Sequence, residues 1–114
     1  MPFIEVKTAK KLKSDVKLAI KAGIGASISL IPGKAEEKLM MCIRDAEPLY
    51  FRGEERDNCA FVEVRLKDKA ELADKQNLTV AIYDVLEQKA GIAKDDVYLC
   101  FLEFDNWGSR GVLK

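Results

Sequence analysis

The stretch PFIEV at residues 2–6 decides the fold, because it returns almost unchanged as AFVEV at residues 60–64. In both stretches apolar and charged residues alternate, as they do along a half-buried β-strand. The same shift of 58 residues places Gly33 on Gly91 and the apolar stretch 39–45 on 97–103. We interpret the chain as an internal duplication of one structural unit, with pseudo-repeats 2–45 and 60–103.

Each repeat predicts a strand, an amphipathic helix and a second strand. Apolar spacing predicts helices over 12–30 and 70–89, and each ends near a glycine suited to a left-handed turn. Period-two alternation predicts strands over 4–7, 39–45, 60–66 and 96–104. The predicted fold class is therefore α/β (α+β): a duplicated βαβ unit in which a four-stranded mixed sheet carries two helices on one face.

Length and charge restrict the function classes. A chain of 114 residues is long enough for one domain with its own core, and we assign residues 1–114 to a single domain. Lys+Arg and Asp+Glu both number 19, so the net charge is zero and gives no electrostatic support for binding to nucleic acid or an anionic membrane. No apolar run reaches the roughly 18 residues of a membrane-spanning helix. The first residues also lack the order of a signal peptide.

The residue inventory also restricts the chemistry. The chain has no histidine, which removes histidine-based catalysis and histidine metal sites. Cys42, Cys59 and Cys100 form no C-x-x-C pair and lie in apolar stretches, so we interpret them as free buried thiols in a reducing compartment. Catalysis, where it exists, must come from Lys, Asp or Glu, Tyr, Cys or the chain terminus.

The last predicted strand, 96–104, is apolar on both of its faces, and 39–43 is similar. Strands of this kind are normally covered on both sides, but two helices cover only one face of a sheet. We therefore expect a homo-oligomer in which sheets pack face to face. Cover from the chain's own ends is the alternative.

Pro2 has two interpretations. Proline is tolerated at the first position of a strand, where no ladder donor is needed. Alternatively, removal of Met1 would expose a secondary amine on a rigid ring. Burial or a nearby lysine would lower its pKa from the usual value of about 8, so that the neutral amine acts as a general base.

Five segments together resemble the macrophage migration inhibitory factor (MIF) family of the tautomerase superfamily. They are MPFIEV (1–6), PGKAEEKLMMCI (32–43), CAFVEV (59–64), DDVYLCFLEF (95–104) and NWG (106–108). The resemblance covers essentially the whole chain in the same order. It implies a homotrimer with active sites at subunit interfaces and a phenylpyruvate- or dopachrome-type keto–enol tautomerase, without cofactor or metal. It also implies a cytoplasmic protein, or one exported without a signal peptide.

The resemblance also assigns roles to individual residues. It makes Pro2 the catalytic base and Lys34 the ligand of the substrate carboxylate. Tyr98 would come from the neighbouring subunit, and Lys67 would contact substrate through its backbone. The position of Cys100 often holds asparagine in the family, so substrate preference or rate is expected to differ. Trp107 would line the pocket mouth. As isolated residues they have simpler explanations: Lys34 as a solvated cation at a helix end, Tyr98 as a core residue, and Trp107 as a cap of the core or of an interface.

The tail NWGSRGVLK departs most from the family, and Arg110 in it is interpreted either as a carboxylate contact or as a solvated side chain. Three functions remain open at this point. The first is a tautomerase. The second is a cytokine-like interaction protein with weak or vestigial activity and an unknown host receptor. The third is another reaction of the superfamily, for which the sequence shows no clear additional set of arginine or acidic residues.

Overall fold

The computed structural model describes residues 1–114, and its first half contains the expected strand, helix and strand. Strand β1 (Pro2–Thr8) is followed by helix α1 (Ser14–Ser27) and strand β2 (Met40–Arg44). Two short 3-10 turns, η1 (Ile28–Leu30) and η2 (Glu36–Lys38), connect the helix to the second strand. The α-helix is therefore shorter than the predicted range 12–30, because its last turn tightens into η1.

The second half repeats this order. Strand β5 (Ala60–Lys67) is followed by helix α2 (Leu72–Ala90), a 3-10 turn η3 (Lys94–Asp96) and strand β6 (Val97–Phe104). Helix α2 ends at Gly91, whose φ of 67° is left-handed and whose N–H donates to the Glu87 carbonyl. The duplicated βαβ unit is therefore confirmed. No helix is long and apolar enough to cross a membrane.

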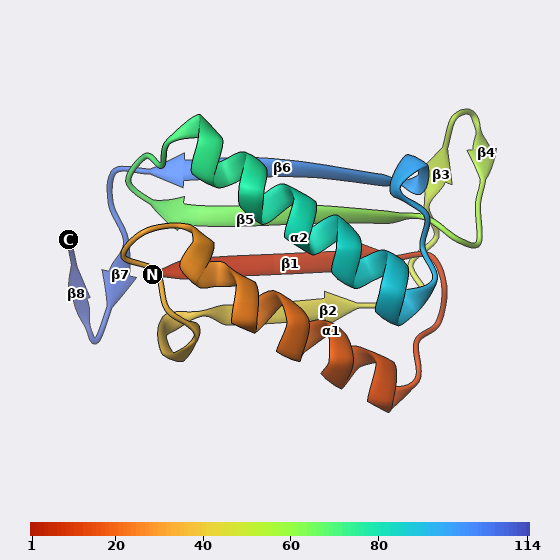
Figure 1. The fold of residues 1–114 in the computed structure, drawn as a ribbon, viewed down its shortest axis with the longest axis horizontal. Coiled ribbons are helices and arrows are strands. Elements are labelled where there is room, and N and C mark those ends of the chain that lie inside the picture. The colour runs from red at the N-terminus through yellow and green to blue at the C-terminus, as the bar shows by residue number, and fades with distance from the viewer.

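The four long strands form one mixed sheet in the order β2-β1-β5-β6. Within each repeat the two strands are parallel, whereas β1 and β5 pair antiparallel at the centre, with Pro2 opposite Leu66. The two repeats therefore meet along their first strands, and β2 and β6 are the edges (Figure 1).

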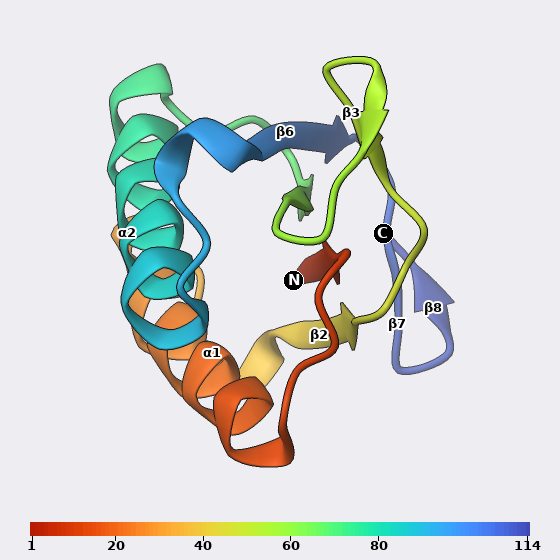
Figure 2. The same ribbon diagram turned by 90° about the vertical axis from the view of Figure 1, so that its right-hand side faces the viewer.

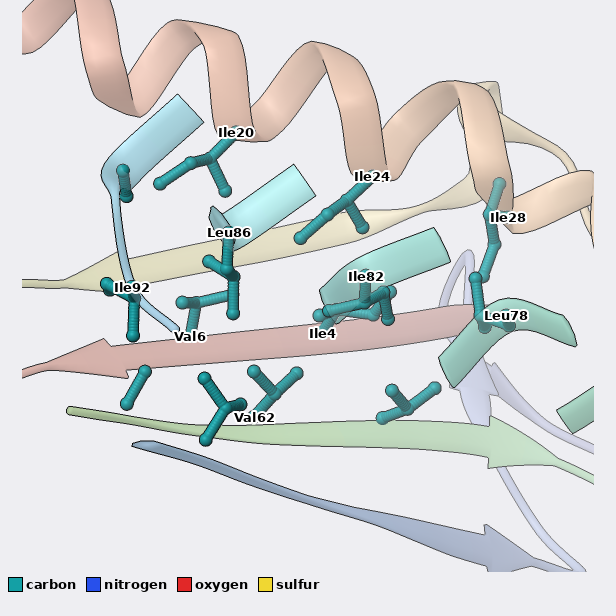
Figure 3. Close-up of a cluster of buried hydrophobic side chains, with 14 of the residues drawn as sticks. Ile4, Val6, Ile20, Ile24, Ile28, Val62, Leu78, Ile82, Leu86 and Ile92 are labelled. Carbon is teal, nitrogen blue, oxygen red and sulfur yellow. The ribbon is translucent and has the colours of Figure 1, made fainter. Parts of the chain in front are cut away.

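Both helices cover the same face of the sheet, as Figure 2 shows. Alternate residues of β1 and β5 point to this face and are fully buried, whereas their neighbours are only half-buried. The core side chains interlock between sheet and helices (Figure 3), and they include Ile4, Val6, Ile20, Ile24, Ile28, Val62, Leu78, Ile82 and Leu86. Two helices on one face agree with the prediction.

The opposite face combines apolar edges with a charged centre. Tyr98 and Met40 from the edge strands are 62% and 69% exposed, so these edges present uncovered apolar surface. The central strands place Glu5 and Glu63 on this face, opposite each other in the register. Each carboxylate has a cation nearby: Arg44 lies 3.8 Å from Glu5, and Arg65 lies 3.1 Å from Glu63. The uncovered apolar surface therefore follows the edges of the sheet and leaves its centre polar.

The two repeats also share a polar contact that holds each helix to its second strand. Asp45 after β2 accepts a hydrogen bond from the Leu12 N–H at 2.8 Å and pairs with Lys17 at 3.1 Å. At the positions 58 residues later, Glu103 accepts from the Ala70 N–H and pairs with Lys75 at 3.1 Å. These hydrogen bonds, more than any other cause, lower the pKa of both carboxyl groups.

The structure extends the repeat beyond 45 and 103. Hairpin β3 (Tyr50–Phe51) to β4 (Glu54–Glu55) turns through Arg52 and Gly53, and hairpin β7 (Gly108–Ser109) to β8 (Val112–Leu113) turns through Arg110 and Gly111. All four turn residues have positive φ, between 54° and 81°, as in type I′ hairpins. The hairpins lie at opposite ends of the sheet (Figure 1), on the side away from the helices (Figure 2). The tail is therefore a second copy of the 50–55 hairpin.

Candidate active site

Pro2 lies at the start of the central strand β1 and is buried. Its position opposite Leu66 places it at the end of the sheet where β5 runs out through Lys67. The chain enters β1 there because proline needs no ladder donor at the first position of a strand. Met1 precedes it, so the nitrogen of Pro2 is an amide in this chain and the free amine belongs to Met1.

Three lysines surround this amine. Burial lowers the pKa of the Met1 amino group, and the charge and hydrogen bond of Lys34 lower it further, with smaller contributions from Lys38 and Lys67. The Lys34 ammonium is held in place because it donates to the Lys67 carbonyl at 3.1 Å. The predicted residues Pro2, Lys34 and Lys67 therefore lie together, although they come from separate elements.

A cavity of about 550 Å³ opens beside Pro2. Trp107 lines it, as expected for a residue at a pocket mouth, and Phe3 and Met40 add apolar wall. The hairpin β7–β8 closes one side because the Trp107 N–H donates to the Lys114 carbonyl at 2.8 Å and the Lys114 N–H donates back at 3.0 Å. The volume falls within the usual range for small-ligand sites.

Tyr98 and Cys100 lie elsewhere in the same chain. Tyr98 pairs with Phe61, and Pro2 pairs with Leu66. Phe61 and Leu66 are five residues apart on β5, which corresponds to about 17 Å along the sheet. Cys100 pairs with Glu63, which is three residues from Leu66 on β5. One copy of the chain therefore does not bring these two residues to Pro2.

Tyr98 instead belongs to an apolar cluster at the far end of the sheet. Its ring packs edge-on against Phe51 with centroids 4.9 Å apart. A second cavity of about 210 Å³ is lined only by apolar residues, namely Leu49, Tyr50, Phe51, Cys59, Ala60, Phe61 and Tyr98. Because Tyr50 is 74% exposed, this end presents aromatic surface that the chain leaves uncovered.

The three cysteines are free, as expected, but only Cys59 is fully buried. Burial raises the pKa of the Cys100 thiol, and the Glu63 carboxylate raises it further. Cys100 is therefore a neutral thiol near pH 7 and contributes bulk and a weak donor to the sheet surface. No group of three or more Cys, Asp or Glu side chains is arranged to hold a metal ion.

Sequence analysis missed two cationic residues of the Pro2 cavity. Lys38 and Arg65 both line it. Lys38 follows Lys34 by four residues through η2, whereas Arg65 reaches the cavity from the central strand β5. Side chains of β5 alternate between the two faces of the sheet, and Arg65 lies on the face away from the helices. That Arg65 lies beside Pro2 follows only from the pairing of β5 with β1.

No family model and no curated protein matches the chain, but solved structures do. MIF2 of Leishmania major superposes with a TM-score of 0.90 at 21% identity, covering 100% of this chain and 97% of that one. A MIF-like protein of Entamoeba histolytica gives 0.85 at 22% identity, covering 99% and 98%. A fused 4-OT described as an asymmetric trimer gives 0.84 at 11% identity, covering 96% and 94%. The chain therefore has the fold of MIF proteins and of tautomerase superfamily members, as its sequence resemblance predicts.

Proposed function

We propose that this protein is a keto–enol tautomerase of 2-keto acids, of the phenylpyruvate or dopachrome type, with the nitrogen of Pro2 as general base. One observation carries the proposal. The amino group of Met1, directly before β1, is partly buried beside Lys34, Lys38 and Lys67, and this environment lowers its pKa. The MIF-type and tautomerase-type fold agrees with this chemistry.

The proposal requires that Met1 is removed. The Pro2 nitrogen then becomes a secondary amine one residue further into the same environment. Burial and the three lysines disfavour its protonated form, so the neutral amine is available near pH 7. A chain that retains Met1 has an amide at Pro2 and is expected to be inactive.

The reaction is a transfer of one proton. The neutral Pro2 amine removes a proton from the carbon next to the substrate carbonyl, and the electron pair moves to the carbonyl oxygen as the enolate forms. Lys34 binds the substrate carboxylate with its ammonium, which already lies 3.1 Å from the Lys67 carbonyl. The protonated proline then returns the proton to the other end of the enol system. Backbone donors and Lys34 stabilise the developing negative charge.

We further propose a homotrimer in which a neighbouring copy supplies Tyr98 and Cys100 to each Pro2 site. The separation of Tyr98 from Pro2 within one chain supports this arrangement, because a shared site needs the residue from another copy. The uncovered aromatic cluster around Tyr50, Phe51 and Tyr98 supports it as well. A structurally similar fused 4-OT is itself described as a trimer. Sedimentation that finds a monomer would contradict the shared site.

The direct test compares wild type with Pro2→Ala in phenylpyruvate tautomerisation, after mass spectrometry has established the N-terminus of each. General bases contribute about 10²–10⁴-fold, so kcat/KM should fall at least about 100-fold. Lys89→Gln serves as a control, because Lys89 is exposed on α2 and lines neither the Pro2 cavity nor the Tyr98 cavity. Equal rates for wild type and Pro2→Ala would refute the base. Turnover of no keto acid would favour the interaction-protein alternative.

The pH profile provides a second test. The burial and lysine charges that lower the pKa of the Met1 amine would act on the Pro2 amine once Met1 is removed, so kcat/KM should rise with pH through a pKa below the usual value of about 8. After burial, the charge of Lys34 is the largest cause of the lowered amine pKa, and Lys34→Met removes it. The pKa of the amine should therefore rise, and the increase of kcat/KM with pH should occur at a higher pH. If kcat/KM of Lys34→Met rises at the same pH as that of wild type, Lys34 does not lower the pKa of the base.

A further inference from the structure

The cavity beside Pro2 carries positive charge, and two of its cations have no anionic partner in the chain. Of its ten lining residues, three are cations, Lys38, Arg65 and Arg110, and none is acidic. Arg65 pairs with Glu63 at 3.1 Å. The ammonium of Lys38 and the guanidinium of Arg110 have neither an ion pair within 4.0 Å nor a hydrogen bond.

The duplicated hairpin shows what an arginine at this turn position does when it is structural. Arg52, the counterpart of Arg110, donates to the Asp95 carbonyl at 2.6 Å and lies 3.9 Å from the Asp96 carboxylate. Its guanidinium also stacks 4.6 Å above the Phe51 ring. Arg110 has the same left-handed backbone, with φ of 54°, but none of these partners. The guanidinium of Arg110 therefore lines the cavity beside Pro2 without a hydrogen-bond or ion-pair partner.

Positive charge lies on two sides of Pro2. The proposed carboxylate ligand Lys34 lies toward Lys67, in a hollow that it shares with Pro32 and Asp68. Arg110 and Lys38 lie on the hairpin side, with Trp107. An adjoining hollow of about 460 Å³ on the hairpin side adds Lys114, and Glu37 is the only acidic side chain that lines it. A substrate with one carboxylate bound by Lys34 leaves Arg110 and Lys38 without an ion pair, although Glu37 lies in the same hollow.

We infer that, among 2-keto acids, the site prefers one with two anionic groups over monocarboxylates such as phenylpyruvate, and that Arg110 and Lys38 bind the second group. This inference rests on the proposed tautomerase function and names its substrate class. Arginine binds carboxylate through two parallel hydrogen bonds, and charge-assisted bonds of this kind are the strong ones. Arg110 and Lys38 act on the distal group of the substrate and determine specificity, while Pro2 carries the chemistry.

Binding can be tested separately from catalysis. Glutarate and pentanoate have the same number of carbons and differ in one terminal carboxylate, so calorimetric titration of the full-length protein with each isolates the second charge. Trp107 is the only tryptophan, so its fluorescence reports whether the ligand enters this cavity. Glutarate should bind at least about tenfold more tightly. Arg110→Gln should remove most of this difference and leave pentanoate unchanged, and Lys38→Gln should reduce it in part.

Lys89→Gln is the matched control, because Lys89 is an exposed cation on α2 with no ion pair. It should leave both affinities unchanged. Equal affinity for glutarate and pentanoate, no measurable glutarate binding, or a glutarate preference that persists in Arg110→Gln would each overturn the inference. Because Arg110 and Lys38 are exposed, thermal unfolding should show that both variants fold as wild type does.

Catalysis then separates this inference from the function on which it rests. Deuterium exchange at C3 is measured for 2-oxoglutarate and for 2-oxopentanoate, in which a methyl group replaces the distal carboxylate. We expect faster exchange of 2-oxoglutarate, with an advantage in KM that Arg110→Gln removes. Exchange of both acids at equal kcat/KM overturns the dianion inference and keeps the tautomerase. Exchange no faster than with Pro2→Ala overturns the tautomerase, and a glutarate preference would then identify only an anion site.

Discussion

The two halves of the chain use the same polar contact to attach helix to sheet. Asp45 binds the backbone before α1 and the side chain of Lys17, and Glu103 does the same before α2 with Lys75. Each of these residues has its counterpart 58 positions later. The same is true of Gly33 and Gly91, which both have positive φ, and of the two hairpins, so the scaffold is repeated down to individual hydrogen bonds.

The candidate site shows the opposite behaviour. Pro2 corresponds to Ala60, Lys34 to Ile92, and Tyr98 to Met40. Each of these three residues therefore has a counterpart without its chemistry. Repetition marks what the fold requires, and its absence marks positions free to acquire function. Cys100 and Arg110 are exceptions, because their counterparts are Cys42 and Arg52. Cys100 is the site residue most easily explained as scaffold, whereas Arg110 differs from Arg52 in its contacts.

The largest effect is expected when a core isoleucine of either helix is shortened to alanine, which tests whether the two repeats support the sheet equally. Ile24 and Ile82 occupy corresponding positions on α1 and α2, and both are completely buried. Ile24→Ala and Ile82→Ala should each lower the free energy of unfolding by about 2–5 kcal/mol, because each leaves a cavity between helix and sheet. Urea unfolding at one fixed protein concentration measures both, since assembly would make stability depend on concentration.

The two losses should agree within about 1 kcal/mol, well inside the spread of such truncations at unrelated core sites. A large loss in one half and a negligible loss in the other would break the comparison. It would show that the two helices are not equivalent supports of the sheet.

Sequence alone predicts the fold here because the duplication supplies each element twice. Alternation in PFIEV and AFVEV identifies two central strands, and their repetition predicts which elements follow. The hairpin repeat escapes notice because only the pair Arg-Gly is shared, at 52–53 and 110–111, within otherwise different residues. Each hairpin owes its shape to two residues with positive φ, the arginine and the glycine of its turn. The side chains on either side of the turn do not encode this backbone conformation.

The candidate site is predictable in part. The resemblance assigns Pro2, Lys34 and Trp107, and the structure places Trp107 in the cavity beside Pro2 and Lys34 beside the Met1 amine. Lys38 and Arg65 were missed because they join the cavity through the turn η2 and the antiparallel pairing of β5 with β1. No local pattern in the sequence encodes a pairing between strands that lie so far apart in the chain.

A medium-sized effect is expected from the paired carboxylates. Asp45 and Glu103 both have lowered pKa values in the folded chain, so the unfolded chain binds more protons at acidic pH. The stability that they contribute is fully present above the unfolded pKa of about 4 and is lost as pH falls through the lowered folded values. Asp45→Asn and Glu103→Gln should therefore destabilise at pH 7, by about 1 kcal/mol for Glu103.

The difference between wild type and each variant should shrink as the pH falls from 6 toward 2, measured as the free energy of urea unfolding at each pH. Asp15→Asn is a control, because this exposed carboxylate on α1 accepts only from the neighbouring Val16 N–H. If the difference from wild type does not shrink with falling pH for one variant, the carboxylate replaced in that variant does not anchor its helix through its charge.

The smallest effect separates the two hairpin arginines. Arg52→Gln should lower the free energy of unfolding by about 0.5 kcal/mol, because it loses a half-exposed ion pair with Asp96 and the stacking on Phe51. Arg110→Gln should cause no measurable change, since its guanidinium has no partner to lose. Both positions keep the same left-handed backbone, so the substitution strains them equally and the difference reports the side-chain contacts. A loss at Arg110 as large as that at Arg52 would mean that Arg110 is held by the folded protein or by another copy of it, and an arginine already held would not be free to bind an anion beside Pro2.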